Sequence, residues 1–263
     1  IREGESELLI RPEGRPKTAL ADLRALHLVN VGGVPLATGM VAQSKATGKM
    51  PQTAAEIAAW LIDDAIPAAK REALIAARLQ HAGEIIPLMA QGLPEESGSK
   101  EEYRRIPWIW RVAIAAGKSG DADTIRAVLI ASLPAEGQSL EHWQSVVLGG
   151  GLINGISLSG PWSSEELAKI VGEDTSLKTA WNRSLELATK MADDESAPTG
   201  TRYDALRMVA LRDWTIAGPQ LLRYLQKGVH DELQMGSISG LADVRQPEVA
   251  GHLINGYEHF SAH

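Results

Sequence analysis

The stretch that most constrains the fold is 104–133, which has the pattern of two helices joined by a short turn. Apolar residues recur at three- and four-residue steps on both sides of the turn, and this spacing is helical. Gly117 and Gly120 favour a left-handed turn that ends the first helix, and Asp121 or Asp123 can cap the second. A turn this short requires the two helices to lie antiparallel. The sequence therefore predicts a helical hairpin.

The hairpin pattern recurs along the chain, at 70–93, 202–225 and 231–257. Each hairpin has an apolar anchor in its first helix, and these anchors are Leu74, Ile114, Val209 and Ile238. A second apolar residue follows each anchor after 11 or 12 positions. Two helices per unit, at a period of about 30–47 residues, are typical of HEAT and armadillo repeats. We therefore predict an all-α, HEAT/armadillo-like α-solenoid of stacked antiparallel helix pairs, with an irregular helical bundle as the alternative.

The predicted organisation is a linker or lead-in over residues 1–16, followed by a helical-repeat domain over residues 17–263. The lead-in holds two Gly, two Pro and many charges, a composition typical of loops. A helix is expected over 18–29, where Leu residues share one face. The sequence opens on Ile1 in a charged segment with no initiating Met. We therefore expect a fragment of a longer protein or a processed chain.

Several helix starts have the capping-box pattern, in which a Ser or Thr and a Glu three residues later each bind a free amide. The candidate boxes are Thr53–Glu56, Ser99–Glu102 and Ser163–Glu166. A longer helix is expected over 139–156, although it contains the run Gly149-Gly150-Gly151. Each glycine costs about 1 kcal/mol in a helix interior. The run therefore either breaks the helix or lets a neighbouring backbone come close.

Composition and motifs exclude most kinds of site. The net charge of −7 argues against a nucleic-acid partner, because phosphate binding relies on clustered Lys and Arg. No apolar run is long enough for a transmembrane helix, and a chain with no Cys has no thiolate chemistry. The glycines at 149–151 fit neither phosphate-loop template, and His259 with His263 lacks a third metal ligand. We expect no catalytic residue, no cofactor and no metal.

One segment has the composition of a protein interface. The candidate interface residues are Tyr103, Arg104, Arg105, Trp108 and Arg111, and Trp and Arg are common interface anchors. Trp108 and Trp110 lie about 200° apart on a helix, so they cannot face the same core. Trp110 is expected to point inward because it precedes Ile114 by one turn. Trp108 then either anchors a partner or covers a repeat junction, with Pro107 starting the helix.

The hairpins at 104–133 and 201–260 resemble the HEAT-repeat region of large bacterial membrane-bound dehydrogenase-like proteins. In that family a β-propeller precedes the helical repeats, and a c-type haem domain with a CxxCH motif follows them. The resemblance implies a connecting module in an exported or periplasmic protein, with the catalytic residues outside it. This chain has no Cys, so it carries no haem attachment site.

These observations predict a non-catalytic helical-repeat scaffold that mediates protein–protein or interdomain contacts. Its expected partner is a protein or a neighbouring domain of the same chain. The alternative is an enzyme on the same kind of fold, of the lyase or DNA-glycosylase type, since fold does not fix function. A glycosylase would need a basic concave face, which the acidic balance disfavours. A lyase would need a polar groove with a buried acid.

Overall fold

A computed structural model describes residues 50–93 and 99–260. Within these ranges every regular element is a helix, and the described residues belong to one compact unit. The prediction of an all-α fold is confirmed for this part of the chain. The lead-in over 1–16, the helix over 18–29 and the predicted domain start at residue 17 lie outside the described residues. None of the described helices is long and apolar enough to span a membrane.

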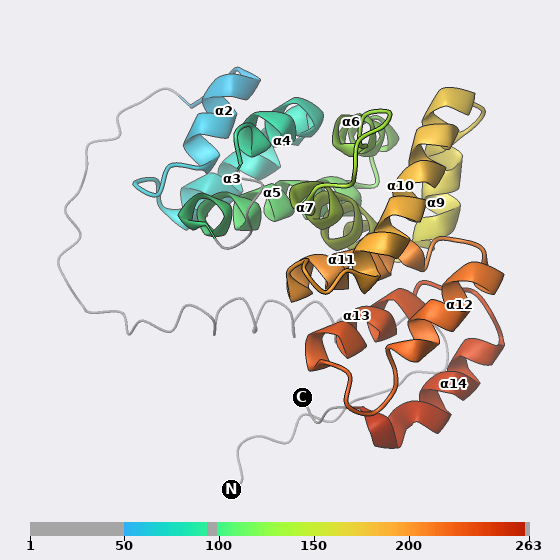
Figure 1. Cartoon of the computed structure of the whole chain (residues 1–263). Helices are drawn as coiled ribbons and strands as arrows, with labels where there is room; N and C mark the ends of the chain where they lie inside the picture. The colour runs from blue at the N-terminus through green and yellow to red at the C-terminus, as the bar shows by residue number, and fades with distance from the viewer. Residues whose placement is uncertain (1–49, 94–98, 261–263) are drawn as a thin grey trace, which may run out of the picture. The chain divides into compact units, whose positions relative to one another are not determined.

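The helices follow one another with short connections (Figure 1). In chain order they are α2 (Ala54–Leu61), α3 (Ala68–Ala77), the 3-10 turn η1 (Leu79–His81), α4 (Ala82–Ala90), α5 (Lys100–Ser119), α6 (Ala122–Ser132), α7 (His142–Ser145), the π-helical η2 (Val146–Ile153), α8 (Asn154–Ser159), α9 (Ser163–Val171), α10 (Thr175–Asp193), α11 (Thr199–Val209), α12 (Trp214–Arg223), α13 (Asp231–Leu241), α14 (Glu248–Gly256) and the 3-10 turn η3 (Tyr257–His259).

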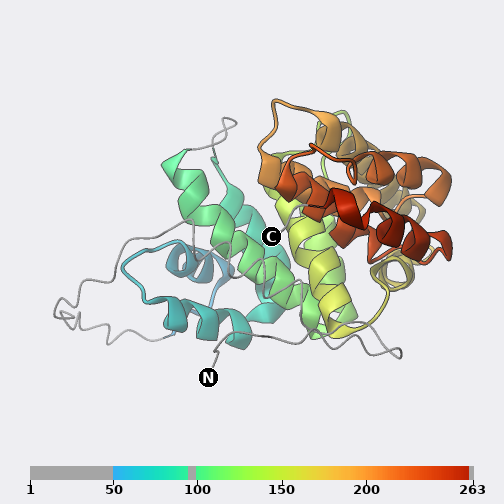
Figure 2. The same cartoon turned by 90° about the horizontal axis from the view of Figure 1, so that it is seen from below.

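The helices pack in two series, and within each series successive members are in contact. One series runs through α3, α5, the continuous rod α7–η2–α8, α11 and α13. The other runs through α2, α4, α6 and α9. Helix α10 packs on α11, and α12 packs on α13. Figures 1 and 2 show α11–α14, in orange to red, gathered on the opposite side of the rod from α2–α4.

The rod α7–η2–α8 resolves the two interpretations of the glycine run. The helix does not break, and every residue of η2 is buried. A Cβ added at Gly149 would lie 2.0 Å from the carbonyl oxygen of Asp204, and one at Gly151 would lie 2.3 Å from Cβ of Ala113. Gly155 similarly approaches a carbonyl oxygen of α5. The glycines therefore let the backbones of α5 and α11 come close to the rod.

The local signals in the first hairpin are mostly confirmed. Gly120 has φ 68° and ends α5 in the left-handed conformation, which glycine adopts at no steric cost. The carboxylate of Asp121 accepts a hydrogen bond from the backbone N–H of Thr124 at 3.0 Å and caps α6. Gly117 does not belong to the turn. It lies inside α5, where an added Cβ would meet the carbonyl oxygen of Leu152 at 2.6 Å.

The three predicted capping boxes have different outcomes. Thr53 and Glu56 form the reciprocal pair at the start of α2. The hydroxyl of Ser99 accepts from the backbone N–H of Glu102 at 3.1 Å and caps α5. The box at Ser163 is wrong, because α9 begins at Ser163 itself and its N-cap is Trp162, whose side chain makes no capping bond.

The anchor positions are correct in two hairpins and displaced in two. Leu74 and Val209 are fully buried. Ile114 is half-buried. The face of α5 that packs in the core is centred on Ala113, one residue earlier, and on the residues one turn before and after it. Ile238 packs partly buried against the core. The spacing of the anchors identified the helices, but in α5 it placed the core one residue too far along the chain.

Candidate functional site at the start of α5

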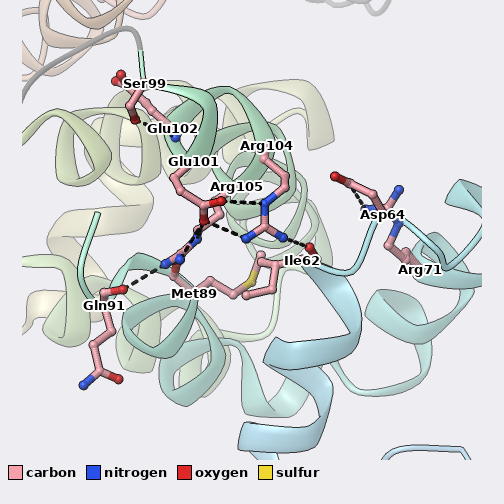
Figure 3. Close-up of polar contacts among 10 residues, drawn as sticks. All are labelled: Ile62, Asp64, Arg71, Met89, Gln91, Ser99, Glu101, Glu102, Arg104 and Arg105. Carbon is pink, nitrogen blue, oxygen red and sulfur yellow. Dashed lines mark hydrogen bonds and ion pairs between the residues drawn. The ribbon is translucent and has the colours of Figure 1, made fainter. Parts of the chain in front are cut away.

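The first two turns of α5 are organised around one carboxylate. Oε2 of Glu101 lies 2.6 Å from Nη2 of Arg104 and 2.8 Å from Nε of Arg105 (Figure 3). These spacings of three and four residues place all three side chains on one side of the helix. Hydrogen bonds from Arg104 first, and then from Arg105, hold the pKa of the Glu101 carboxyl below its ordinary value. We call Glu101, Arg104 and Arg105 the arginine clamp.

The two guanidinium groups of the arginine clamp reach the ends of two other helices. Arg104 donates to the carbonyl oxygen of Ile62, the C-cap residue of α2. Arg105 donates to the carbonyl oxygen of Gln91, the C-cap residue of α4, at 2.8 Å. The last carbonyls of a helix have no partner within it and carry the negative end of the helix dipole. The clamp therefore ties α5 to α2 and α4 (Figure 3).

This arrangement gives both arginines partners within the fold. Their side chains are only 28% and 17% exposed, for Arg104 and Arg105 respectively. Each already binds Glu101 and a backbone carbonyl. A guanidinium that is satisfied within the fold offers few free donors to a partner. The clamp is therefore a structural device that fixes the relative positions of three helices.

Trp108 is buried, with 7% of its surface exposed, so the interpretation of Trp108 as a partner anchor is wrong. The guanidinium carbons of Arg71 and Arg111 lie 4.0 Å and 4.8 Å from the centre of its ring. A cation over an indole ring is attracted by the ring quadrupole. Arg71 comes from α3 and also donates to the carbonyl oxygen of Leu61 at 3.3 Å. Trp108 thus covers the junction between α3 and α5, within a helix that Pro107 does not start.

The remaining aromatic residues of this segment divide between core and surface. Trp110 is half-buried, and its indole N–H donates to the carbonyl oxygen of Gly150 at 2.8 Å. It therefore points toward η2, in agreement with the expected inward direction. Tyr103 is 72% exposed. Of the five candidate interface residues, Tyr103 has the side chain that lies openly on the surface, while Arg111 is half-buried beside Trp108.

Replacing Trp108 by Phe is expected to lower the free energy of unfolding by about 1–2 kcal/mol. The smaller ring leaves a void and weakens the contact with both guanidinium groups. Tyr103→Phe is the matched control, because that ring is exposed and its change should alter stability by less than about 0.5 kcal/mol. Urea denaturation measures both variants. Equal stability of Trp108→Phe and the wild type would contradict the buried position.

Glu101→Gln is expected to lower the melting temperature at pH 7 and to have a smaller effect near pH 3. The Glu101 pKa is lowered by folding, so its contribution is present above the unfolded pKa of about 4.3. That contribution is lost as the pH falls through the folded-state pKa, where the wild-type carboxyl also becomes neutral. Thermal melts of both proteins at the two pH values measure the effect. A difference that persists unchanged at pH 3 would mean that the charge of Glu101 is not its cause.

A groove of about 640 Å³ lies beside the arginine clamp. Its walls are the end of α4, one face of α5 with Glu102 and Ile106, and the segment 138–143 that leads into α7. Glu141 is the N-cap of α7 and forms a reciprocal capping box with Gln144. This cap places His142 and Trp143 in the first turn of α7, at the groove. The sequence did not single out these residues.

The polar side of the groove holds two carboxylates, an imidazole and an indole. Oε1 of Glu102 lies 4.0 Å from Nδ1 of His142, and their side chains are 18% and 29% exposed. The indole N–H of Trp143 donates to the carboxylate of Glu141. In the sequence this site corresponds to Glu141-His142-Trp143, which follow the buried Leu140. These residues can be recognised as part of a site only when the fold places α5 beside them.

Metal binding finds no support in the described part of the chain, where no group of three or more His, Asp or Glu side chains could hold a metal ion. His259 belongs to η3, whereas His263 lies outside the described residues. No protein-family model matches this chain, and no curated protein or solved structure is significantly similar to it.

Proposed function

We propose that the described unit is a HEAT-like α-solenoid and acts as a non-catalytic scaffold for a protein or a neighbouring domain. The observation that carries the proposal is the order of packing. Successive members of each helix series contact one another, from α3 through α5 and the rod to α13. In a solenoid each repeat contacts its neighbours and leaves long surfaces for partners. The resemblance to the HEAT region of dehydrogenase-like proteins agrees with a connecting role and would imply an exported protein.

The surface best suited to such a partner lies beside the arginine clamp. The clamp ties the end of α4 to α5, and both helices line the groove next to it. A preformed site loses less conformational entropy on binding than a mobile one. Tyr103 is 72% exposed one residue from Glu102 of the groove wall, and Tyr is a common interface residue. These features favour a partner that binds along the start of α5.

An enzyme of the lyase type is the second candidate, and one observation favours it. The groove is polar, and its Glu102 side chain is only 18% exposed beside His142. Carboxylate and imidazole groups are the usual general acids and bases. The DNA-glycosylase version gains no such support, because the net charge is −7 and duplex binding relies on a basic surface.

Site-specific photo-crosslinking tests the scaffold proposal. Benzoyl-phenylalanine replaces Tyr103 in the full chain, expressed in its native host, and also replaces Tyr257, which is 75% exposed on η3 at the other end of the unit. We expect discrete covalent adducts from position 103 and none from position 257, with the attached protein identified by mass spectrometry. Absence of adducts at both positions would contradict a scaffold that binds through α5. Substrate turnover that Glu102→Gln abolishes would favour the enzyme instead.

A further inference from the structure

The groove beside the arginine clamp is lined by both apolar and acidic residues. The apolar residues are Pro87, Ala90, Leu93, Ile106, Ala131 and Leu140. The titratable residues are Glu102, Glu141 and His142. Among the described residues that line the groove none is Lys or Arg. The site is therefore complementary to a ligand that carries positive charge next to apolar groups.

The arginines near the groove bind groups outside it. Arg105 binds Glu101 and the carbonyl oxygen of Gln91. Arg183 donates to the carbonyl oxygens of Ala135 and Gln138. Neither arginine lines the groove, and Glu102 and Glu141 are the acidic residues that do.

Trp143 adds a second feature that suits a cation. Its indole N–H binds the carboxylate of Glu141, which holds the ring and the carboxylate next to each other. An aromatic face attracts Lys and Arg groups, and the attraction is strongest where water is excluded. A carboxylate adds a charge-assisted hydrogen bond. A cation bound by Glu141 would therefore lie close to the indole of Trp143.

The size of the groove indicates more than a single side chain. A volume of about 640 Å³ falls within the range of about 300–1,000 Å³ for sites that enclose a whole small ligand. Lys and Arg side chains bury an aliphatic stem along apolar surface and keep the charged end at polar groups. The six apolar residues offer room for such a stem and for the residues on either side of it.

We infer that the groove binds an extended segment of a partner protein through a Lys or Arg side chain. The charged end lies between Glu102 and Glu141, close to Trp143, and the stem lies along the apolar residues of the groove. The inference rests on the proposed scaffold function and names the chemistry of the partner. It does not require His142 to change its protonation state.

The test is a binding titration with a defined basic peptide. The probe is a fluorescein-labelled peptide of sequence Ala-Leu-Ala-Lys-Arg-Ala-Leu-Ala, and the same peptide with Gln-Gln at its centre is the neutral control. Fluorescence anisotropy measures binding to the full chain. We expect at least about tenfold tighter binding of the basic peptide, the size of effect that one partly desolvated cation contact supplies. Equal binding of both peptides would overturn the inference.

Protein variants locate the binding. Glu102→Gln with Glu141→Gln removes both carboxylates but retains an oxygen acceptor at the N-cap of α7. Glu173→Gln with Glu248→Gln is the matched control, because both side chains are exposed and neither lines the groove. We expect the first pair to lose about tenfold in affinity for the basic peptide and the second pair to lose little. A loss that is equal in both pairs would show a general charge effect and overturn the site.

A further variant and a small probe complete the test. Ala131→Lys places a cation at the groove in the last turn of α6, where the helix dipole favours positive charge, so folding is retained. It should weaken binding of the basic peptide as strongly as removal of the carboxylates. If butylammonium ion binds as tightly as the basic peptide, the groove binds a small cation, and the inference of a peptide ligand is wrong. Adducts from position 103 without peptide binding in the groove would reject this inference and leave the scaffold proposal standing.

Discussion

Replacing Gly149 by Ala is expected to lower the free energy of unfolding by more than about 4 kcal/mol, or to prevent folding. The added Cβ would lie 2.0 Å from the carbonyl oxygen of Asp204 and 2.7 Å from its carbonyl carbon. Both are backbone atoms of α11, so they cannot move away by a side-chain rotation. Overpacking that side chains can absorb costs about 1–3 kcal/mol. Here η2 or α11 must shift as a whole, which also disturbs the contact with α5.

Gly251→Ala is the control for this prediction. Gly251 lies inside α14, and an added Cβ would meet no atom within 4 Å. Because Ala loses less conformational entropy than Gly in a helix, this variant should be more stable by about 0.5–1 kcal/mol. Urea denaturation followed by circular dichroism measures both changes. Gly149→Ala with wild-type stability would contradict the close approach of α11 to η2.

The glycine run illustrates what the sequence could and could not predict. The pattern over 149–151 left two interpretations, a broken helix or a close helix contact. The choice depends on Asp204 and Ala113, which are distant in the chain and whose own sequence context contains no sign of the contact. Periodicity predicted the helices correctly because it is a local property. The contact between helices depends on which faces meet, and one sequence does not determine this.

The same difference between local and distant contacts explains which capping predictions were correct. The turn at Gly120 and Asp121 was predicted correctly because its geometry depends on neighbouring residues. The box at Ser163 has the same sequence pattern, yet Ser163 lies inside the first turn of α9 and is fully buried. The glutamate of that box, Glu166, instead binds Lys169 at 3.0 Å, within α9. A capping pattern therefore locates the region of a helix start, but it does not by itself identify the N-cap residue.

For a related reason, the sequence could not decide whether Arg104, Arg105 and Trp108 contact a partner or the rest of this chain. Trp and Arg indicate buried, directional contacts, but composition does not say whether the partner is another protein or another helix. Arg104 and Arg105 each lie three or four residues from Glu101, a spacing that favours pairing within one helix. That signal was present in the sequence. The contacts with the ends of α2 and α4, and the groove beside them, depend on tertiary packing that the sequence pattern did not contain.

Arg207→Met is expected to lower the free energy of unfolding by about 3–5 kcal/mol. Nη2 of Arg207 lies 3.0 Å from Oδ2 of Asp243, and the two side chains are 5% and 3% exposed. Asp243 also accepts a hydrogen bond from the hydroxyl of Ser157. Met retains the aliphatic stem but leaves the carboxylate of Asp243 buried without its cation. Loss of one member of a buried ion pair is strongly destabilising for this reason.

A double variant separates the buried charge from the loss of packing. Asp243→Asn removes the charge and retains an oxygen that can accept from Ser157, so Arg207→Met with Asp243→Asn buries no unpaired charge. We expect this double variant to be more stable than Arg207→Met alone by about 1–3 kcal/mol, with denaturation curves of the four proteins giving the coupling energy. Ser157 lies in α8, Arg207 in α11, and Asp243 just after α13, so these three residues link three successive members of one helix series. A double variant no more stable than the single one would mean that the packing of α8, α11 and α13, and not the buried charge, determines the loss.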